Sequence, residues 1–179
     1  MYRKAIKILP SFLTLTLRLF LLQFFTLQLY RFCFYFTFKG SNPFNGEVLQ
    51  AFIMGMEFDM VITTYGIFLP FILLVLNEYL HSKTKIFFHA ARISSLLIFW
   101  IYALISAADI PFFKQFFSHF TSQAFLWAES PGMVTKLIFG NISYYGFLII
   151  FFIHGYIIYK IVEFLFRIEK TKLENSNTG

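Results

Sequence analysis

Residues 9–38 read LPSFLTLTLRLFLLQFFTLQLYRFCFYFTF, and this stretch decides the fold class. It contains only two charged residues, Arg18 and Arg31, in a run longer than the roughly 20 residues that a transmembrane helix needs. Three basic residues precede it, as in a secretory signal peptide. However, the apolar run is much longer than in such a peptide, and no small-x-small cleavage site follows it. We therefore expect an uncleaved first transmembrane helix.

The composition of the whole chain supports this interpretation. Of 179 residues, 58% are hydrophobic and 13% are charged, whereas about a quarter are charged in a typical soluble domain. A soluble chain of this length could not bury its 28 phenylalanines in one core, but lipid can solvate them. The net charge is +6, and the basic residues gather at segment ends, which suits lipid headgroups rather than nucleic acid. The expected partners are therefore membrane lipids and other membrane proteins of the cell envelope, and no nucleic acid.

Further apolar segments predict about four crossings of the membrane, in an all-α integral membrane domain covering residues 1–168. The predicted spans are about 9–38, 60–76, 93–108 and 142–159. Residues 47–56 are interpreted as a short helix near the membrane surface. Pro70 predicts a kink in the second span, because its ring removes one backbone hydrogen bond. Residues 169–179 are polar and are expected to form a disordered tail.

The segment Asp109-Ile110-Pro111 is typical of a helix start, with an acidic cap followed by proline in the first turn. After it, phenylalanines fall on one helical face and polar residues, including His119, on the other. This pattern predicts an amphipathic helix over about 110–127 that lies on the outer membrane surface, with Trp127 near the headgroups and His119 simply solvated.

Lysine and arginine predict the orientation. With four crossings, the N-terminus, the second connection and the C-terminal tail lie on one side and carry ten of them, while the other two connections carry four. The positive-inside rule then places both termini in the cytoplasm. The first and third connections, which hold Glu47, Glu57, Asp59, Asp109 and Glu129, would face outward.

The two arginines of the first span cannot both lie outside one hydrocarbon core. Only twelve residues separate Arg18 from Arg31, which is about 18 Å of helix. We expect Arg31 at the outer interface. Arg18 then lies deeper, and either snorkels towards water or faces the bundle, because an arginine at the membrane centre costs about 2.5–3.5 kcal/mol.

Several acidic residues are candidates for chemistry, each with a simpler alternative. Glu57 and Asp59 could coordinate a cation or accept a substrate proton, but residues two apart on a helix point in different directions. The simpler interpretation is that both are interfacial charges that stop the second span. Asp109 is interpreted first as the helix cap. Glu163 and Arg167 form an i,i+4 pair on the fourth span.

His154 lies within the fourth span, and an ionisable residue at that depth is a functional candidate by default. Because no acidic residue stands at helical spacing from it, an interhelical hydrogen bond is the favoured interpretation. An intramembrane enzyme using Asp59, Asp109 and His154 is the remaining alternative. The histidines and the single cysteine lack metal-site spacing, so we expect no catalytic residue, metal site or cofactor in this chain.

Three stretches resemble a known family. The string Gly55-Met56-Glu57-Phe58-Asp59, with Tyr65 and Pro70 after it, resembles the "G-x-x-F-D … Y … P" stretch of lipoteichoic acid synthase-type phosphoglycerol transferases, which are sulfatase-like proteins. Ala108-Asp109-Ile110-Pro111-Phe112-Phe113 is similar to their "Asp-x-x-Tyr/Phe-Phe" stretch, and Arg31-Phe32 is similar to the end of their first span. The resemblance covers about residues 10–165.

The resemblance implies a bacterial-type cytoplasmic (inner) membrane protein. Family members carry five transmembrane helices and an outer catalytic domain with a nucleophilic threonine and a divalent metal. No position here matches that domain, so the resemblance implies a truncated membrane anchor that is inactive alone. Its candidate lipid- or partner-contact residues are Arg18, Arg31, Glu57, Asp59, Asp109, Trp127 and His154. The alternative is a small independent multi-pass membrane protein, a transport or accessory subunit.

Overall fold

The computed structural model describes residues 10–40, 44–80, 86–119, 132, 140 and 142–176, and within them the regular structure is helical. The four long helices are α2 (Ser11–Phe38), α3 (Gly46–Tyr79), α4 (Ile86–Phe116) and α6 (Ile142–Ser176). Each of them is long and apolar enough to cross a membrane. The sequence prediction of an all-α, multi-pass membrane protein with about four spans is confirmed.

Local chemistry explains several helix ends. The side chain of Asn45 accepts a hydrogen bond of 3.0 Å from the backbone N–H of Val48, which caps the start of α3. Gly40, just after α2, has a φ of 55°, a left-handed conformation that glycine adopts at little cost. Phe117 has a φ of 54° and donates its N–H to the carbonyl of Phe113, so α4 ends there and the chain turns.

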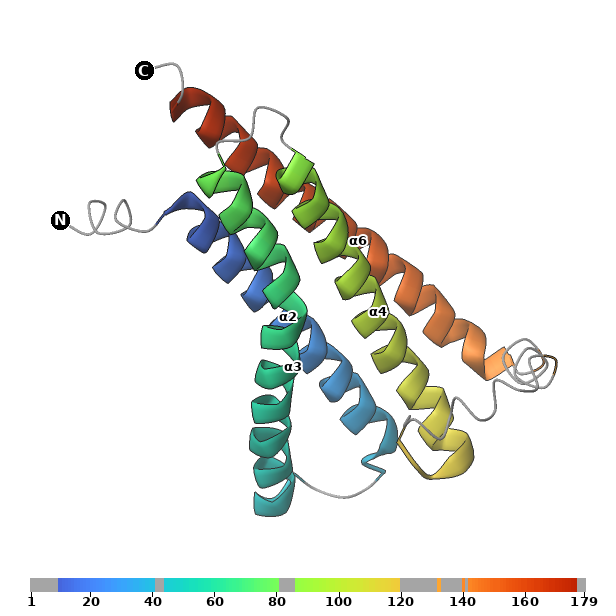
Figure 1. Ribbon diagram of the computed structural model, residues 1–179. Coiled ribbons are helices and arrows are strands. Elements are labelled where there is room, and N and C mark those ends of the chain that lie inside the picture. The colour runs from blue at the N-terminus through green and yellow to red at the C-terminus, as the bar shows by residue number, and fades with distance from the viewer. Residues whose placement is uncertain are drawn as a thin grey trace.

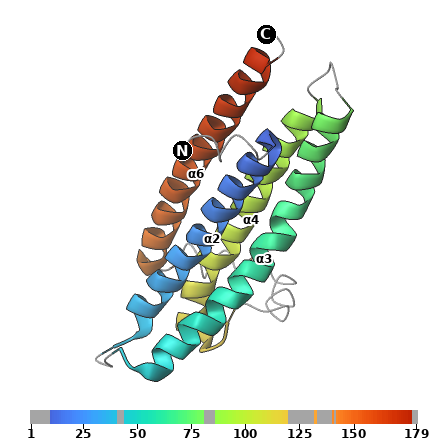
Figure 2. The same ribbon diagram turned by 90° about the vertical axis from the view of Figure 1, so that its left-hand side faces the viewer.

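Consecutive helices run in opposite directions, so the bundle has an up-and-down topology (Figure 1). Figure 2 shows α2 and α4 in the middle, with α6 on one side and α3 on the other. Of the described helices, α3 and α6 do not contact each other, whereas α2 and α4 each contact every other helix. One end of the bundle therefore carries the end of α2, the start of α3 and the end of α4.

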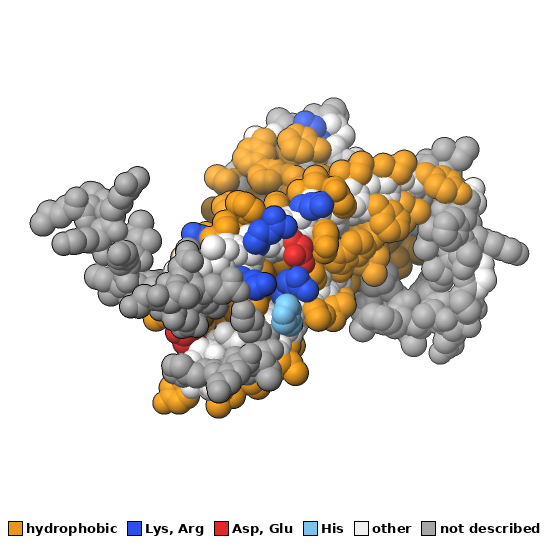
Figure 3. Space-filling view, turned by 90° about the horizontal axis from the view of Figure 1, so that it is seen from above, with side chains coloured by type: hydrophobic (Ala, Val, Ile, Leu, Met, Phe, Trp, Pro, Cys, Tyr) orange, Lys and Arg blue, Asp and Glu red, His pale blue; other side chains and the backbone are white. Residues whose placement is uncertain are grey.

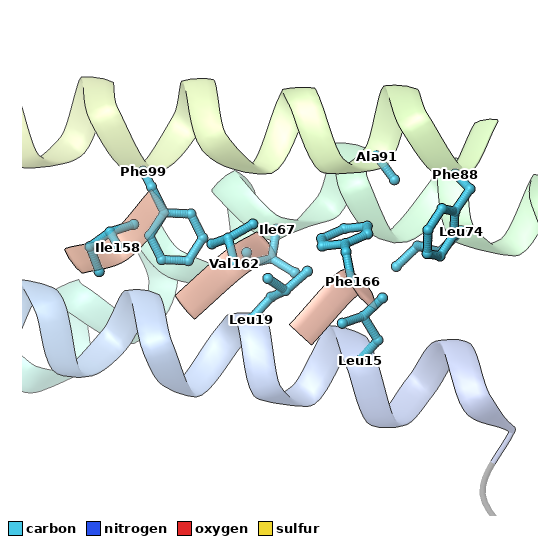
Figure 4. Close-up of a cluster of buried hydrophobic side chains, with 10 residues drawn as sticks. All are labelled: Leu15, Leu19, Ile67, Leu74, Phe88, Ala91, Phe99, Ile158, Val162 and Phe166. Atoms are coloured by element: carbon cyan, nitrogen blue, oxygen red, sulfur yellow. The ribbon is translucent and has the colours of Figure 1, made fainter. Parts of the chain in front are cut away.

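The apolar core lies in the half of the bundle near the start of α2. All four helices contribute to it (Figure 4). The buried side chains of this core are Leu15, Leu19, Ile67, Leu74, Phe88, Ala91, Phe99, Ile158, Val162 and Phe166. Lipid is as apolar as leucine, so this core stabilises the bundle through close packing rather than through removal of apolar surface from water.

Two glycines allow large aromatic side chains to pack against a neighbouring helix. A Cβ at Gly66 would lie 2.8 Å from the ring of Tyr102, and a Cβ at Gly155 would lie 2.9 Å from the indole of Trp100. The hydroxyl of Tyr102 also donates a hydrogen bond of 3.2 Å to the carbonyl of Ile62. Trp100 and Tyr102 therefore act as packing residues between helices.

The second half of α3 departs from the direction of its first half. Figure 1 shows the two halves of this helix running at different angles. Pro70 lies inside α3, and its ring removes the hydrogen bond to the carbonyl of Gly66 and crowds that carbonyl. The predicted kink in the second span is consistent with this change of direction.

Three predicted boundaries are wrong. Residues 47–56 do not form a separate surface helix, because α3 continues without a break from Gly46 to Tyr79. Asp109 does not cap a new helix, because α4 continues past Pro111 to Phe116 and the proline removes only one backbone hydrogen bond. Residues 169–176 are helical rather than disordered, since α6 continues to Ser176 through residues that favour helix.

The predicted interfacial helix over 110–127 does not begin as a separate helix. Residues 110–116 belong to α4, and residues 117–119 are not helical. Residues 120–127, with Trp127, lie outside the described residues, as do residues 177–179 of the predicted tail.

Candidate functional site

The most polar interhelical contact lies between α2 and α3, near the end of the bundle where α2 finishes. Arg31 Nε and Nη2 donate to Asp59 Oδ2 at 3.0 and 2.8 Å. Gln28 Nε2 donates to the same oxygen at 2.7 Å. Arg31 Nη2 also donates to the carbonyl of Gly55 at 3.0 Å. One carboxylate oxygen therefore receives three hydrogen bonds, all of them from α2.

Helical geometry explains why these residues meet. Gln28 and Arg31 are three apart on α2, and Gly55 and Asp59 are four apart on α3, so each pair shares one face of its helix. A Cβ at Gly55 would collide with the guanidinium of Arg31, so only glycine leaves room for this arginine. The absence of a side chain at Gly55 thus positions the charge of Arg31 against Asp59.

Burial makes this ion pair energetically important. Asp59 is 6% exposed, although it lies in a helix that crosses the membrane. Loss of Arg31 would leave this carboxylate buried and uncompensated, which costs about 3–5 kcal/mol. The helix continues through Asp59, which is buried against α2 rather than exposed, and its interfacial depth stays a prediction. Glu57 is exposed and points elsewhere, so the prediction that the two carboxylates diverge is confirmed.

A second polar pair joins the end of α4 to the residues that follow it. His119 Nδ1 lies 2.9 Å from Asp109 Oδ2. The His119 ring stacks on Phe34 with centroids 5.1 Å apart and packs against Phe113 at 5.2 Å. The left-handed turn at Phe117 returns the chain towards α4 and brings His119 to these partners. His119 is exposed, as predicted, but it also contacts Asp109 and two phenylalanines, which the sequence did not predict.

These two polar pairs line one cavity of about 220 Å³. It lies between α2, α3 and α4 at the end of the bundle where α2 finishes. Its lining residues are Leu27, Tyr30, Arg31, Phe34, Asp59, Ser106, Asp109 and His119. A water molecule occupies about 30 Å³ in the liquid, so the cavity has room for a polar group of several heavy atoms.

Tyr30 connects this cavity to α6. Its hydroxyl lies 2.9 Å from Nδ1 of His154, and the two rings meet edge to face with centroids 5.1 Å apart. The favoured sequence interpretation of His154, an interhelical hydrogen bond, is confirmed. Through Tyr30, this histidine supports the wall of the cavity without lining it.

The structure thus places the predicted candidates in different groups. Arg31, Asp59 and Asp109 line the cavity, and His154 contacts a lining residue. Arg18 is half-buried, near the other end of α2, and makes no ion pair with the described residues. Glu57 is exposed on α3, away from Arg31. Trp127 lies outside the described residues.

Sequence reasoning missed four residues of this site or its support: Gln28, Tyr30, Ser106 and His119. A partial signal existed for two of them. Gln28 and Tyr30 have side chains that can form hydrogen bonds, and they lie in an apolar span within one helical turn of Arg31. Ser106 carried no signal, because serine is common at close helix contacts in membranes.

The cavity lining offers two carboxylates, one guanidinium and one imidazole. Over residues 10–40, 44–80, 86–119, 132, 140 and 142–176, no group of three or more His, Cys, Asp or Glu side chains could hold a metal ion. These groups can recognise a polar group through hydrogen bonds and charge.

Comparisons with protein-family models, with curated proteins and with solved structures give no match for this chain.

Proposed function

We propose that this chain is a membrane domain that holds the polar headgroup of a membrane lipid in the cavity between α2, α3 and α4. One observation carries the proposal. Three stretches far apart in the sequence resemble lipoteichoic acid synthase-type phosphoglycerol transferases, and each contributes to the wall or support of this one cavity. Arg31 comes from the first, Gly55 and Asp59 from the second, and Asp109 from the third.

The position of the cavity supports a lipid rather than a soluble ligand. The cavity lies near one end of a bundle whose outer faces are apolar, with exposed side chains such as Leu29, Phe58 and Ile105 on its helices. Phospholipids surround such faces in a bilayer, with their headgroups level with the helix ends. A headgroup can therefore reach the cavity from the plane of the membrane.

The charge distribution supports an outward-facing cavity. Figure 3 shows Lys and Arg side chains gathered on the opposite end of the bundle, where α3 and α6 finish. Arg92, Arg167 and Lys170 belong to that half. The positive-inside rule places such an end in the cytoplasm. We propose that both termini are cytoplasmic and that the cavity faces the outer leaflet of a bacterial-type cytoplasmic membrane.

In this proposal the chain binds and positions, while phosphoglycerol transfer belongs to a sulfatase-like domain that the resemblance implies. That domain would supply the metal and the nucleophile. Other envelope membrane proteins are the proposed partners. The second candidate function is that of an independent transport or accessory subunit. The neighbouring genes distinguish these two candidate functions. A following coding sequence for one more span and a sulfatase-type domain supports the proposal, whereas a set of transport genes supports the alternative.

Photo-crosslinking tests the binding site directly. The chain is placed in nanodiscs containing a phospholipid with a photoreactive headgroup, and the attachment points are mapped by mass spectrometry. We expect attachment near Arg31 and Ser106. Ser106→Trp should fill the cavity and remove this attachment, whereas Leu104→Trp, on the exposed face of the same helix, should leave it intact. Equal labelling of the two tryptophan variants would disprove a headgroup site in the cavity.

Cysteine labelling tests the orientation. Single cysteines are placed at the exposed positions Lys39, Ser118 and Thr171 in a Cys33→Ala background. We expect an impermeant maleimide added from outside to label Lys39→Cys and Ser118→Cys, but not Thr171→Cys. Outside labelling of Thr171→Cys alone would invert the orientation and place the cavity in the inner leaflet.

A further inference from the structure

Asp59 has one oxygen that its ion pair does not use. The three hydrogen bonds that Gln28 and Arg31 donate to Asp59 all go to Oδ2, and Oδ1 accepts none from the described residues. Asp59 is 6% exposed, and it lines the cavity. An ionised carboxylate is a strong acceptor at both oxygens, and burial without a donor is costly. The unused oxygen therefore marks a place where a ligand can donate.

Two other lining groups have unused hydrogen-bonding capacity. Over the part of the chain that the structure describes, the hydroxyl of Ser106 makes no hydrogen bond, and the His119 ring is engaged only through Nδ1, by Asp109. Serine accepts as well as donates, and the second ring nitrogen can accept when Nδ1 carries the proton. Three lining residues thus have unused acceptors, whereas Nη1 of Arg31 is the charged donor that no described residue engages.

The charges of the lining residues, like their hydrogen bonds, favour a ligand group that donates hydrogen bonds over an anionic one. Asp59 and Asp109 contribute two carboxylates to the lining, and Arg31 contributes one permanent positive charge. The Nε and Nη2 donors of Arg31 are already engaged by Asp59 and Gly55. A phosphate inside the cavity would face both carboxylates, and these arginine donors would not be free for it.

We propose that the cavity takes a terminal headgroup that carries hydrogen-bond donors, either the ammonium of an ethanolamine or the hydroxyls of a glycerol. This inference rests on the proposed function. The terminal group donates to Asp59 Oδ1, and Ser106 and His119 provide further acceptors. The phosphate of the lipid stays at the mouth of the cavity, outside the reach of the carboxylates.

Lipids that differ only in these donors test the inference. The chain is placed in nanodiscs of phosphatidylcholine that contain a minor fraction of phosphatidylethanolamine or phosphatidylglycerol, and retained lipids are counted by native mass spectrometry. Phosphatidylcholine has the same phosphate but no donor at its end. We expect the ethanolamine lipid, the glycerol lipid or both to be retained roughly tenfold above their share, as one charge-assisted hydrogen bond allows. The two lipids in separate nanodiscs show whether ammonium or hydroxyl is the source.

Variants connect this preference to the cavity. Ser106→Ala removes an acceptor that has no partner among the described residues, so it should lower the preference a few-fold without unfolding the chain. Ser94→Ala is the matched control on α4, since its hydroxyl bonds the carbonyl of Ala91 and does not line the cavity. The double variant Arg31→Gln/Asp59→Asn removes the carboxylate together with its paired charge and should abolish the preference.

The outcomes separate this inference from the proposed function. Headgroup crosslinks that depend on the cavity, together with equal retention of phosphatidylcholine, would overturn the donor preference and leave the lipid site in place. A donor preference that survives both Ser106→Ala and the double variant would also overturn it. Loss of the crosslinks to the cavity would instead remove the proposed function.

Discussion

Two Arg–carboxylate pairs of the described residues join helices in this bundle, and their surroundings differ. Arg31 and Asp59 connect α2 to α3 near one end, whereas Arg92 and Glu163 connect α4 to α6 near the other, with a shortest distance of 3.0 Å. The carboxylate of Asp59 is 9% exposed and that of Glu163 is 25% exposed. Arg92 contacts both oxygens of Glu163, but the donors to Asp59 use only one.

The comparison shows how one kind of contact can have two roles. The more exposed pair has both carboxylate oxygens engaged, which is what a contact between helices requires. The buried pair concentrates its donors on one oxygen and leaves the other beside a cavity, at the higher cost of a buried charge. An arrangement that is costly and incompletely used within the protein is the one expected at a binding site.

The largest expected effect comes from removing Asp59. Asp59→Ala takes the shared acceptor from the buried amide of Gln28 and from Arg31, whose side chain is 31% exposed, and should destabilise the bundle by about 3 kcal/mol. Glu163→Ala is the matched change in the other pair, and should cost on the order of 1 kcal/mol because the Glu163 side chain is more exposed than that of Asp59 and its deletion leaves no buried amide without an acceptor. Unfolding in mixed detergent micelles, followed by circular dichroism, measures both. Equal losses would mean that burial does not distinguish the two pairs.

A smaller effect should follow from Gly55→Ala. The new Cβ would collide with the guanidinium of Arg31, so the arginine must move from Asp59 and from the carbonyl of Gly55. Overpacking of this kind costs about 1–3 kcal/mol. Gly146→Ala is the control, because nothing lies within 4 Å of a Cβ there and alanine favours helix. If thermal unfolding in micelles shows Gly55→Ala to be as stable as this control, the close approach of Arg31 is wrong.

The hydrogen bond between Tyr30 and His154, which connects the cavity to α6, should contribute less to the free energy of unfolding than the Arg31–Asp59 pair. Tyr30→Phe keeps the ring and removes the hydroxyl that meets His154, so a loss of about 1 kcal/mol is expected. Tyr65→Phe, at a tyrosine that is 77% exposed, should change the unfolding midpoint little. The NMR signals of the His154 ring should shift in Tyr30→Phe and stay in place in Tyr65→Phe. An unchanged His154 signal in Tyr30→Phe would contradict the hydrogen bond.

The sequence predicted the features that depend on one helix and missed those that depend on two. Hydropathy located the four spans, and the helical period separated the direction of Glu57 from that of Asp59. The pairing of Asp59 with Arg31 depends on which faces of α2 and α3 meet, and periodicity alone does not contain that information. Residues 9–38 are apolar around the whole helix, so no face of α2 was marked as inward.

Other errors came from patterns that allow two structures. Asp109 before Pro111 is compatible with a helix cap and also with the interior of a helix that tolerates one missing hydrogen bond. Tertiary contacts decide between them, since Asp109 meets His119 and lines a cavity only when α4 continues through it. The contribution of His119 depends on the turn at Phe117, where a left-handed phenylalanine is uncommon and is not predictable from residue type.

The smallest expected effect is the coupling free energy between Glu163 and its arginine partner. The i,i+4 spacing predicts a pair between Glu163 and Arg167, but the structure pairs Glu163 with Arg92 across two helices and leaves Arg167 exposed. Coupling free energies from double-mutant cycles separate the two arrangements. Glu163 and Arg92 should couple by several tenths of a kcal/mol or more, and Glu163 and Arg167 by close to zero. The reverse order would make this contact one of α6 alone, and Arg31–Asp59 would then be the stronger electrostatic link between helices.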